Sequence, residues 1–291
     1  MYINNSQKLL DVTPRQVIRY IRRKFLSEKK VNVKDYSKLS SIFVLSTGRV
    51  GSQTLGTLCG LDKDYLVYHE PKPSLFGLSK AAYDKYGEGA SEIFSESFLA
   101  ARKVLFKYCL KVGKRYMETG PDVTFLAPVI LEALPQTRFI HLVRDPRDVV
   151  RSGMRRRWYD GHRFDKTRIV PAPSSENGQQ WASYSPFQKN LWLWNETNRW
   201  ILDFCSGLSN EKVLVLHAED MFDAYEKELL KLFAFLGSAM PPERKISRVL
   251  GQKLNAQKQG VFPNQTDWSE QMNQELIKIA GGTARALGYE L

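Results

Sequence analysis

A loop with two glycines and an arginine is the first stretch of this sequence whose residue types and spacing can do chemistry. Gly48 and Gly51 allow a tight turn that brings backbone N–H groups close to a ligand. Arg49 lies between them and adds a guanidinium that a plain turn does not need. Hydroxyl side chains add further donors at the same place. We therefore expect an anion to be bound here by Thr47, Gly48, Arg49, Gly51, Ser52, Gln53 and Thr54.

The spacing of this loop differs from that of two common phosphate-binding motifs. The Walker loop has four residues between its glycines and a lysine after the second one. This loop has two residues between Gly48 and Gly51, and no lysine. It also does not match the Gly-x-Gly-x-x-Gly pattern of dinucleotide-binding folds. For the loop taken alone, a simple turn between a strand and a helix remains the alternative.

A second group of chemically capable residues follows the apolar run at 138–143. Arg144 stands at the end of that run, and Ser152 lies eight residues later. Pro146 and Asp148 are typical of the first turn of a helix, so Ser152 falls about two turns into that helix. Because the planar guanidinium suits a phosphate group, we expect Arg144 and Ser152 to bind a second anion.

Glu70 is the candidate general base. It follows the apolar run Tyr65–Tyr68, which reads as a strand. The ligand-binding ends of parallel strands lie on one edge of a sheet, so we expect Glu70 near the glycine loop. A carboxylate beside an anion site can take a proton from an attacking hydroxyl group. Taken alone, Glu70 is equally well explained as a solvated loop acid or as an ion-pair partner of Lys72.

Alternating strands and helices must position these residues. The run at 42–45 has no polar alternation, as in a strand buried on both faces of a parallel sheet. Ser52 is expected to cap the helix that follows the glycine loop. Further strands are predicted at 65–68, 115–119, 138–143 and 212–216, and further helices at 90–112, 128–134, from 146 onward, 187–205, 224–236 and 271–287. This order predicts an α/β fold with one doubly wound, mostly parallel sheet flanked by helices.

The chain divides into a basic extension over 1–40 and a single domain over 41–291. Within that domain, 155–190 reads as an irregular excursion with many arginines, aromatic residues and prolines, and long excursions often serve as lids. We expect it to form a lid over an acceptor at the sheet edge. It could stack on sugar rings or cover a lipid or polyketide, and its arginines could recognise an acidic acceptor. Nucleic acid is a weaker candidate, because no nucleic-acid module accompanies the arginines.

The net charge of +12 points to anionic partners. A basic amphipathic helix over 14–26 is predicted, which either contacts an anionic membrane or packs on its own domain. No secretion signal and no apolar run long enough to span a membrane is evident, and the three cysteines are widely spaced in apolar segments, as buried free thiols are. A soluble, cytoplasmic protein, at most peripheral to a membrane, is expected.

Three segments together resemble the sulfotransferase family that takes the sulfuryl group from 3′-phosphoadenosine 5′-phosphosulfate (PAPS). The segment Thr47–Thr54 is similar to its loop for the 5′-phosphosulfate, with arginine in place of lysine. The segment Leu142–Ser152 resembles its 3′-phosphate motif, including the spacing from arginine to serine. The segment Val213–Met221, followed by a helix to Gly237, resembles a third conserved block.

This resemblance implies a P-loop-NTPase-like sulfotransferase architecture, PAPS as co-substrate, adenosine 3′,5′-bisphosphate (PAP) as product, and no metal. It implies that Arg49 and Glu70 are catalytic and that Arg144 and Ser152 bind the 3′-phosphate. A glutamate after the second strand is used by carbohydrate-modifying and bacterial branches, so the acceptor is expected to be a carbohydrate, a glycolipid or another alcohol. Glu118 is the second choice for the base. The family's C-terminal donor loop is matched in part, by Lys258 and Gly260.

Two other classes compete with this interpretation. A P-loop-like nucleotide kinase would need magnesium and a loop lysine, and the lysine is absent. A non-catalytic protein that binds polyanions or membranes would explain the charge of +12 and the basic N-terminal helix. It would leave the two anion motifs unexplained.

Overall fold

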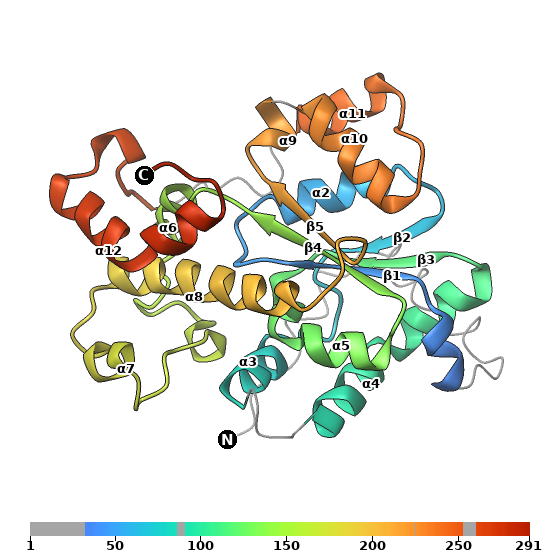
Figure 1. Cartoon of the computed structure of the whole chain (residues 1–291), viewed down its shortest axis with the longest axis horizontal. Coiled ribbons are helices and arrows are strands. Elements are labelled where there is room, and N and C mark those ends of the chain that lie inside the picture. Colours follow the sequence, from blue (N-terminus) through green and yellow to red (C-terminus); the bar gives the residue numbers. More distant parts are fainter. Residues whose placement is uncertain (1–32, 86–90, 224, 253–259) are drawn as a thin grey trace, which may run out of the picture.

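Five short apolar segments form one parallel sheet in the computed structural model, which describes residues 33–85, 91–223, 225–252 and 260–291. The strands lie in the order β2-β3-β1-β4-β5, and each neighbouring pair is parallel. Figure 1 shows helices on both faces of this sheet. The predicted α/β fold is therefore confirmed. The strands are β1 (Ser41–Leu45), β2 (Tyr65–Tyr68), β3 (Arg115–Glu118), β4 (Thr137–Val143) and β5 (Val213–His217).

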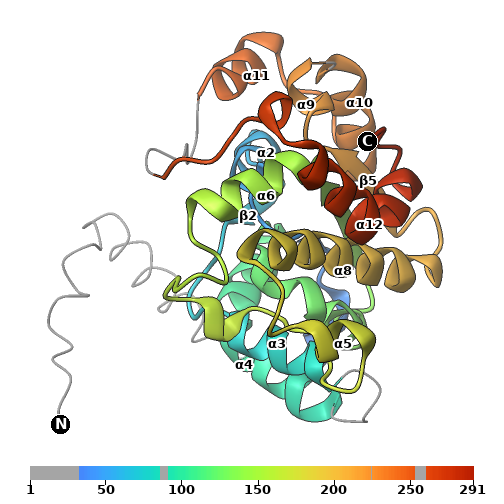
Figure 2. The same cartoon turned by 90° about the vertical axis from the view of Figure 1, so that its left-hand side faces the viewer.

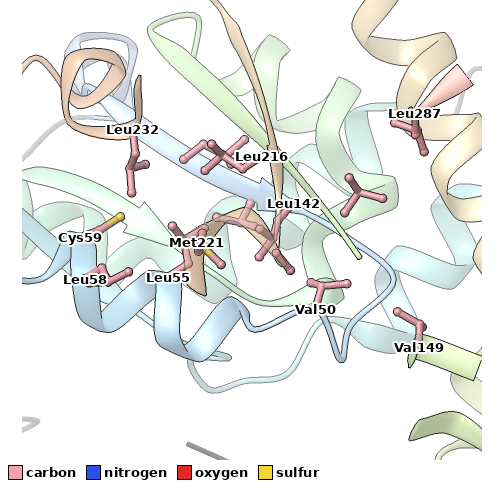
Figure 3. Close-up of a cluster of buried hydrophobic side chains, with 14 of the residues drawn as sticks. Val50, Leu55, Leu58, Cys59, Leu142, Val149, Leu216, Met221, Leu232 and Leu287 are labelled. Atoms are coloured by element: carbon pink, nitrogen blue, oxygen red, sulfur yellow. The ribbon is translucent and has the colours of Figure 1, made fainter. Parts of the chain in front are cut away.

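The central strand β1 is buried on both faces, which is why its sequence is apolar without alternation. Successive side chains of a strand point to opposite faces of the sheet. Ile42 and Val44 accordingly belong to one buried cluster, and Phe43 and Leu45 belong to another. Figure 3 shows the first cluster, which lies between the sheet and the helix α2 (Ser52–Cys59).

The helices divide between the two clusters. The first cluster is covered by α2 together with α9 (Asp220–Asp223), α10 (Tyr225–Leu236) and α11 (Glu243–Leu250). The second is covered by α3 (Phe76–Asp84), α4 (Ser91–Val112), α5 (Ala127–Ala133) and the 3₁₀ segments η2 (Val33–Lys38) and η3 (Pro121–Leu126). The remaining elements are α6 (Pro146–Arg155), η4 (Asp165–Thr167), α7 (Glu176–Gln180), α8 (Pro186–Ser206), η5 (Gln265–Asp267) and α12 (Glu270–Ala286).

Helix α8 contributes to both clusters, and helices near the carboxyl edge of the sheet pack against it. Trp194 belongs to the first cluster, whereas Trp200 belongs to the second. Helices α6 and α12 pack against α8 (Figure 2). The approach of α6 is close: a Cβ atom on Gly153 would lie 2.1 Å from Oδ1 of Asn190. Glycine is therefore required at this crossing.

One local expectation was wrong. Ser52 is the first residue of α2 rather than its cap, because Gly51 takes the cap position with a left-handed φ of 83° that glycine adopts freely. The excursion at 155–190 consists mostly of turns and irregular segments and contains two short helical elements. Helix α6 runs through Arg155, η4 and α7 follow, and α8 begins at Pro186 after a capping box made by Ser185 and Gln188.

Some expectations lie outside the described residues. These are the basic helix over 14–26 and the donor-loop residue Lys258. In the part of the chain that the structure describes, no helix is both long and apolar enough to cross a bilayer. Cys59 and Cys109 are buried and Cys205 is half-buried, and none of the three forms a disulfide in the described chain.

The buried histidine of β4 makes stability depend on pH. Nε2 of His141 lies 2.9 Å from Oδ1 of Asn198, whose amide nitrogen donates to the carbonyl of Trp194, so Nε2 carries the proton of the neutral ring. Burial lowers the pKa of His141 from 6.5 to about 4. In the unfolded chain the imidazole takes up a proton at higher pH than in the folded protein.

The free energy of unfolding is therefore expected to decrease when the pH is lowered. His141 alone should account for a decrease of about 2 kcal/mol from about pH 7 to about pH 5. Urea unfolding of the wild type and of His141→Gln at both pH values measures this contribution. All other titrating groups contribute equally to both proteins, so the difference between the two pH dependences belongs to His141. Equal pH dependence of the two proteins would contradict the assignment.

Candidate active site

A pocket of about 890 Å³ opens at the carboxyl edge of the sheet. It is formed by the segments that follow β1, β2 and β4, together with residues of α3, η3, α8 and the excursion after α6. The structure thus brings together residues that are far apart in the sequence. The predicted site residues that line it are Thr47, Gly48, Arg49, Gly51, Ser52, Gln53, Thr54, Glu70, Arg144 and Ser152.

Three residues of the glycine loop have a left-handed backbone conformation. The φ angles are 82° at Gly48, 63° at Arg49 and 83° at Gly51. The first intrahelical hydrogen bond of α2 runs from the Leu55 amide to the Gly51 carbonyl at 3.0 Å. The amides of residues 52–54 precede this bond, at the positive end of the helix dipole, where N–H groups without intrahelical partners favour an anion.

The two predicted anion motifs meet at Arg49. Its Nε donates to Oγ of Ser152 at 3.0 Å, and Nη1 of Arg144 lies 3.4 Å from the Arg49 carbonyl oxygen. Arg144 is also held by Asp148, with Nη2 and Oδ2 2.6 Å apart. Burial, followed by repulsion from Arg156 and Arg144, lowers the pKa of Arg49 to about 10. The guanidinium is thus charged at neutral pH and lies among other cations, where an anion would be stabilised.

Glu70 lies on the same pocket, after β2. Its side chain is 44% exposed, and its backbone has a φ of 45°, which is uncommon for a residue with a Cβ atom. Its charge acts on Arg49 across the pocket. His69 flanks it: Nδ1 lies 2.6 Å from the Thr119 carbonyl oxygen, and Nε2 lies 4.0 Å from Oε1 of Glu70. Glu70 is therefore an accessible carboxylate beside the glycine loop, as a general base must be.

Glu118, the second choice for the base, is placed elsewhere. Its side chain is fully buried, and Nε and Nη2 of Arg102 donate to its two oxygens at 2.9 and 2.7 Å. Tyr116 also donates to it. It does not line the pocket. The expectation for Glu118 was wrong because β3 turns this side chain into the second cluster, where Arg102 of α4 neutralises it.

Gly260 lies beside the end of α6 and not on the pocket wall. Nε of Arg155 donates to the Gly260 carbonyl at 2.9 Å. The glycine has a φ of 76°, and a Cβ atom there would lie 2.3 Å from the Arg155 carbonyl oxygen. Within the described residues, this position thus holds the returning chain against α6, and a direct role in donor binding stays a prediction.

Several pocket residues were not singled out from the sequence. Arg151 and Arg155 share one face of α6 with Asp148 and Ser152, and their spacing of three and four residues is a signal that could have found them. The excursion, which was expected to cover an acceptor, supplies Arg156, Trp158, Arg168 and Ile169. No motif marks several others, among them Phe76 and Lys80 from α3, Phe125 from η3 and Leu193 from α8.

The fold and the pocket define a class: an α/β protein with a cationic pocket at the carboxyl edge of a parallel sheet. The chain belongs to the sulfotransferase family, whose model matches residues 42–242 of the 291. No curated protein sequence gives a significant match. In the described residues, no three His, Cys, Asp or Glu side chains gather as metal ligands would.

Solved structures share the fold at low sequence identity. The sulfotransferase domain from the curacin biosynthetic pathway is 19% identical with a TM-score of 0.53, over 87% of this chain and 99% of that one. The sulfotransferase domain of the Synechococcus PCC 7002 olefin synthase is 16% identical with a TM-score of 0.51, over 87% and 96%. Mouse sulfotransferase SULT7A1, complexed with PAP, is 17% identical with a TM-score of 0.51, over 91% and 94%. At these identities the likeness concerns the fold alone.

Proposed function

We propose that this protein transfers the sulfuryl group of PAPS to the hydroxyl group of an acceptor, a carbohydrate, glycolipid or other alcohol. One observation carries the proposal: Arg49, Ser152, Arg144 and the carboxylate of Glu70 line one pocket at the sheet edge. Membership of the sulfotransferase family supports it, and so does a structural neighbour that holds PAP.

The two anion motifs divide the donor between them. The amides at the start of α2 and the Arg49 guanidinium hold the 5′-phosphosulfate. Arg144 and Ser152 hold the 3′-phosphate, which distinguishes this donor from ATP. The hydrogen bond from Arg49 to Ser152 links the two groups within the protein. Such preorganised donors stabilise charge without having to reorient.

The reaction is an in-line displacement at sulfur. The acceptor oxygen forms a bond to sulfur, the bond from sulfur to the bridging phosphate oxygen breaks, and PAP leaves. Glu70 takes the proton of the attacking hydroxyl group, and the charge that develops on the bridging oxygen faces Arg49. Positioning and charge stabilisation supply most of the catalysis, as in phosphoryl transfer. The segment at 155–190 covers the acceptor.

Arg144→Ala is expected to weaken PAP binding by roughly 10- to 100-fold, because a charge-assisted contact to the 3′-phosphate is lost. Calorimetric titration of the wild type and the variant with PAP, AMP and ATP measures it. Arg147→Ala is the matched control: Arg147 lies three residues later, in the first turn of α6, but it pairs with Asp145 and does not line the pocket. Its affinity for PAP is expected to match that of the wild type.

Three outcomes would contradict the proposal. Equal affinity of the wild type for PAP and AMP would show that no 3′-phosphate site exists. Magnesium-dependent turnover of ATP would favour a nucleotide kinase, and salt-sensitive binding of polyanions without PAP binding would favour a non-catalytic protein.

A further inference from the structure

The part of the pocket beyond the donor motifs has a cationic wall and an apolar floor. The wall comes from the segment that follows α6 and runs just past η4, with Arg156, Arg163 and Arg168. Figure 2 shows this segment passing α3, against which η4 packs. The floor comes from side chains of α3, η3, α8 and the same segment, namely Phe76, Phe125, Leu193, Trp158 and Ile169.

Arg156 is the most exceptional residue of this wall. Its side chain is half-buried, and its buried Nε atom has no hydrogen-bond partner among the described residues. No carboxylate in the described chain forms an ion pair with it. Burial, followed by the charge of Arg155, lowers its pKa. A desolvated cation without a counterion is costly, so this arrangement indicates a ligand that supplies the negative charge.

The neighbours of Arg156 place it between the two halves of the pocket. Its charge acts on Arg49 in the glycine loop, and also on His162 and Arg168 in the excursion. Arg168 is held rigidly: its Nε donates to Oδ1 of Asp165 at 3.0 Å, and its guanidinium lies 4.0 Å from the centre of the Trp158 ring. Asp165 is thus already engaged, and it leaves the charge of Arg156 uncompensated.

Positively charged side chains also outnumber carboxylates in the pocket as a whole. Eight arginine and lysine residues line it, against three carboxylates, those of Glu70, Asp148 and Glu219. Asp148 is paired with Arg144, and Glu219 accepts from the Asp145 amide and from the Tyr289 hydroxyl. Glu70 faces the glycine loop. The wall at Arg156 and Arg168 therefore keeps a positive field at the place where an acceptor would lie.

We propose that the acceptor carries an anionic group, a carboxylate or a phosphate, in addition to its hydroxyl group, and that Arg156 binds this group. Arg168 adds to the attraction, and the apolar part of the acceptor packs on Phe76, Phe125 and Ile169. This inference rests on the proposed function, because it concerns the acceptor side of that reaction. It narrows the acceptor from alcohols in general to hydroxylated acids with an apolar ring or chain.

The test measures binding to protein that is saturated with PAP, so that the donor's anion sites are filled. The probes are 3-(4-hydroxyphenyl)propanoate and 8-hydroxyoctanoate, each paired with its neutral primary amide, and 8-hydroxyoctylphosphonate. At least one acid is expected to bind roughly 10- to 100-fold more tightly than its amide. The phosphonate decides between the two anionic groups.

Arg156→Gln is expected to abolish this preference for acids. Arg157→Gln is the matched control, because Arg157 is the next residue but is exposed, pairs with Asp160 and does not line the pocket. It should keep the preference of the wild type. Titration with PAP alone, carried out first on all three proteins, tests the donor site separately.

The outcomes separate the two proposals. If PAP binds but no acid is preferred over its amide, or none of the probes binds, the anionic acceptor is overturned and the sulfotransferase proposal stands. If the acids displace PAP, Arg156 belongs to the donor site and the inference is again overturned. If PAP fails to bind while the acids still depend on Arg156, the anion site stands and the proposed donor is wrong.

Discussion

Replacing Glu70 with glutamine is expected to lower kcat for sulfuryl transfer by about 10²- to 10⁴-fold. Glutamine keeps the shape of the side chain but cannot take the proton of the attacking hydroxyl group. Glu70 is suited to this role because it is 44% exposed on the pocket, beside the loop that contains Arg49. Glycine at position 120 leaves room for this side chain, because a Cβ atom there would lie 3.1 Å from Cγ of Glu70.

The affinity for PAP should remain the same in Glu70→Gln, because in the proposed mechanism the glycine loop, Arg144 and Ser152 hold the donor. The decrease in kcat caused by Glu70→Gln should be smaller for nitrophenol acceptors, because their hydroxyl groups ionise without help from a base. Glu132→Gln, on the exposed face of α5 and away from the pocket, is the control and should retain full activity. A variant with wild-type kcat towards an ordinary alcohol would rule out Glu70 as the base.

Replacing Arg102 with methionine is expected to lower the free energy of unfolding by about 3–5 kcal/mol. Arg102 is fully buried on α4 and holds three parts of the chain together. Besides its two bonds to Glu118, it donates from Nη1 to the Pro73 carbonyl at 2.8 Å, and Nη2 lies 3.9 Å from Oδ2 of Asp122. Methionine fills a similar volume but leaves two buried carboxyl groups without a cation.

Denaturant unfolding of a double-mutant cycle separates the lost attraction from lost packing. Arg102→Met combined with Glu118→Leu should recover part of the stability, because the largest uncompensated charge is then removed with its partner. Lys103→Met, on the exposed face of the same helix, should change the free energy of unfolding by less than about 0.5 kcal/mol. If Arg102→Met is as stable as Lys103→Met, the cluster does not support the fold in this way.

The hydrogen bonds of Arg102 also affect the pocket, because Pro73, which accepts one of them, follows Glu70 by only three residues. Arg102 ties that segment to β3 and η3. A less severe variant that folds, such as Arg102→Lys, should therefore lose some activity through the position of Glu70. The sequence offered no sign of this link, since an arginine within a helix of apolar spacing reads as an exposed residue.

Features that depend on neighbouring residues could be predicted from the amino-acid sequence. Buried parallel strands need apolar residues on both faces, so the runs at 42–45, 65–68 and 138–143 were recognisable. The glycine loop and the start of α6 were recognisable too, because tight turns and first helical turns accept few residue types. These local patterns, and the parallel sheet that they imply, predicted that Arg49, Glu70 and Arg144 would share one edge.

The contacts between distant side chains could not be predicted in this way. Arg49 and Ser152 are 103 residues apart, and their hydrogen bond depends on how α6 lies against the glycine loop. Glu70 follows β2 and Glu118 is the last residue of β3, yet Glu70 lines the pocket whereas Glu118 is buried in the core. Likewise, Arg156 lines the pocket and Arg157 does not. The physical reason is that side-chain direction changes with every residue along a strand or helix end, so the outcome is set by packing between distant segments.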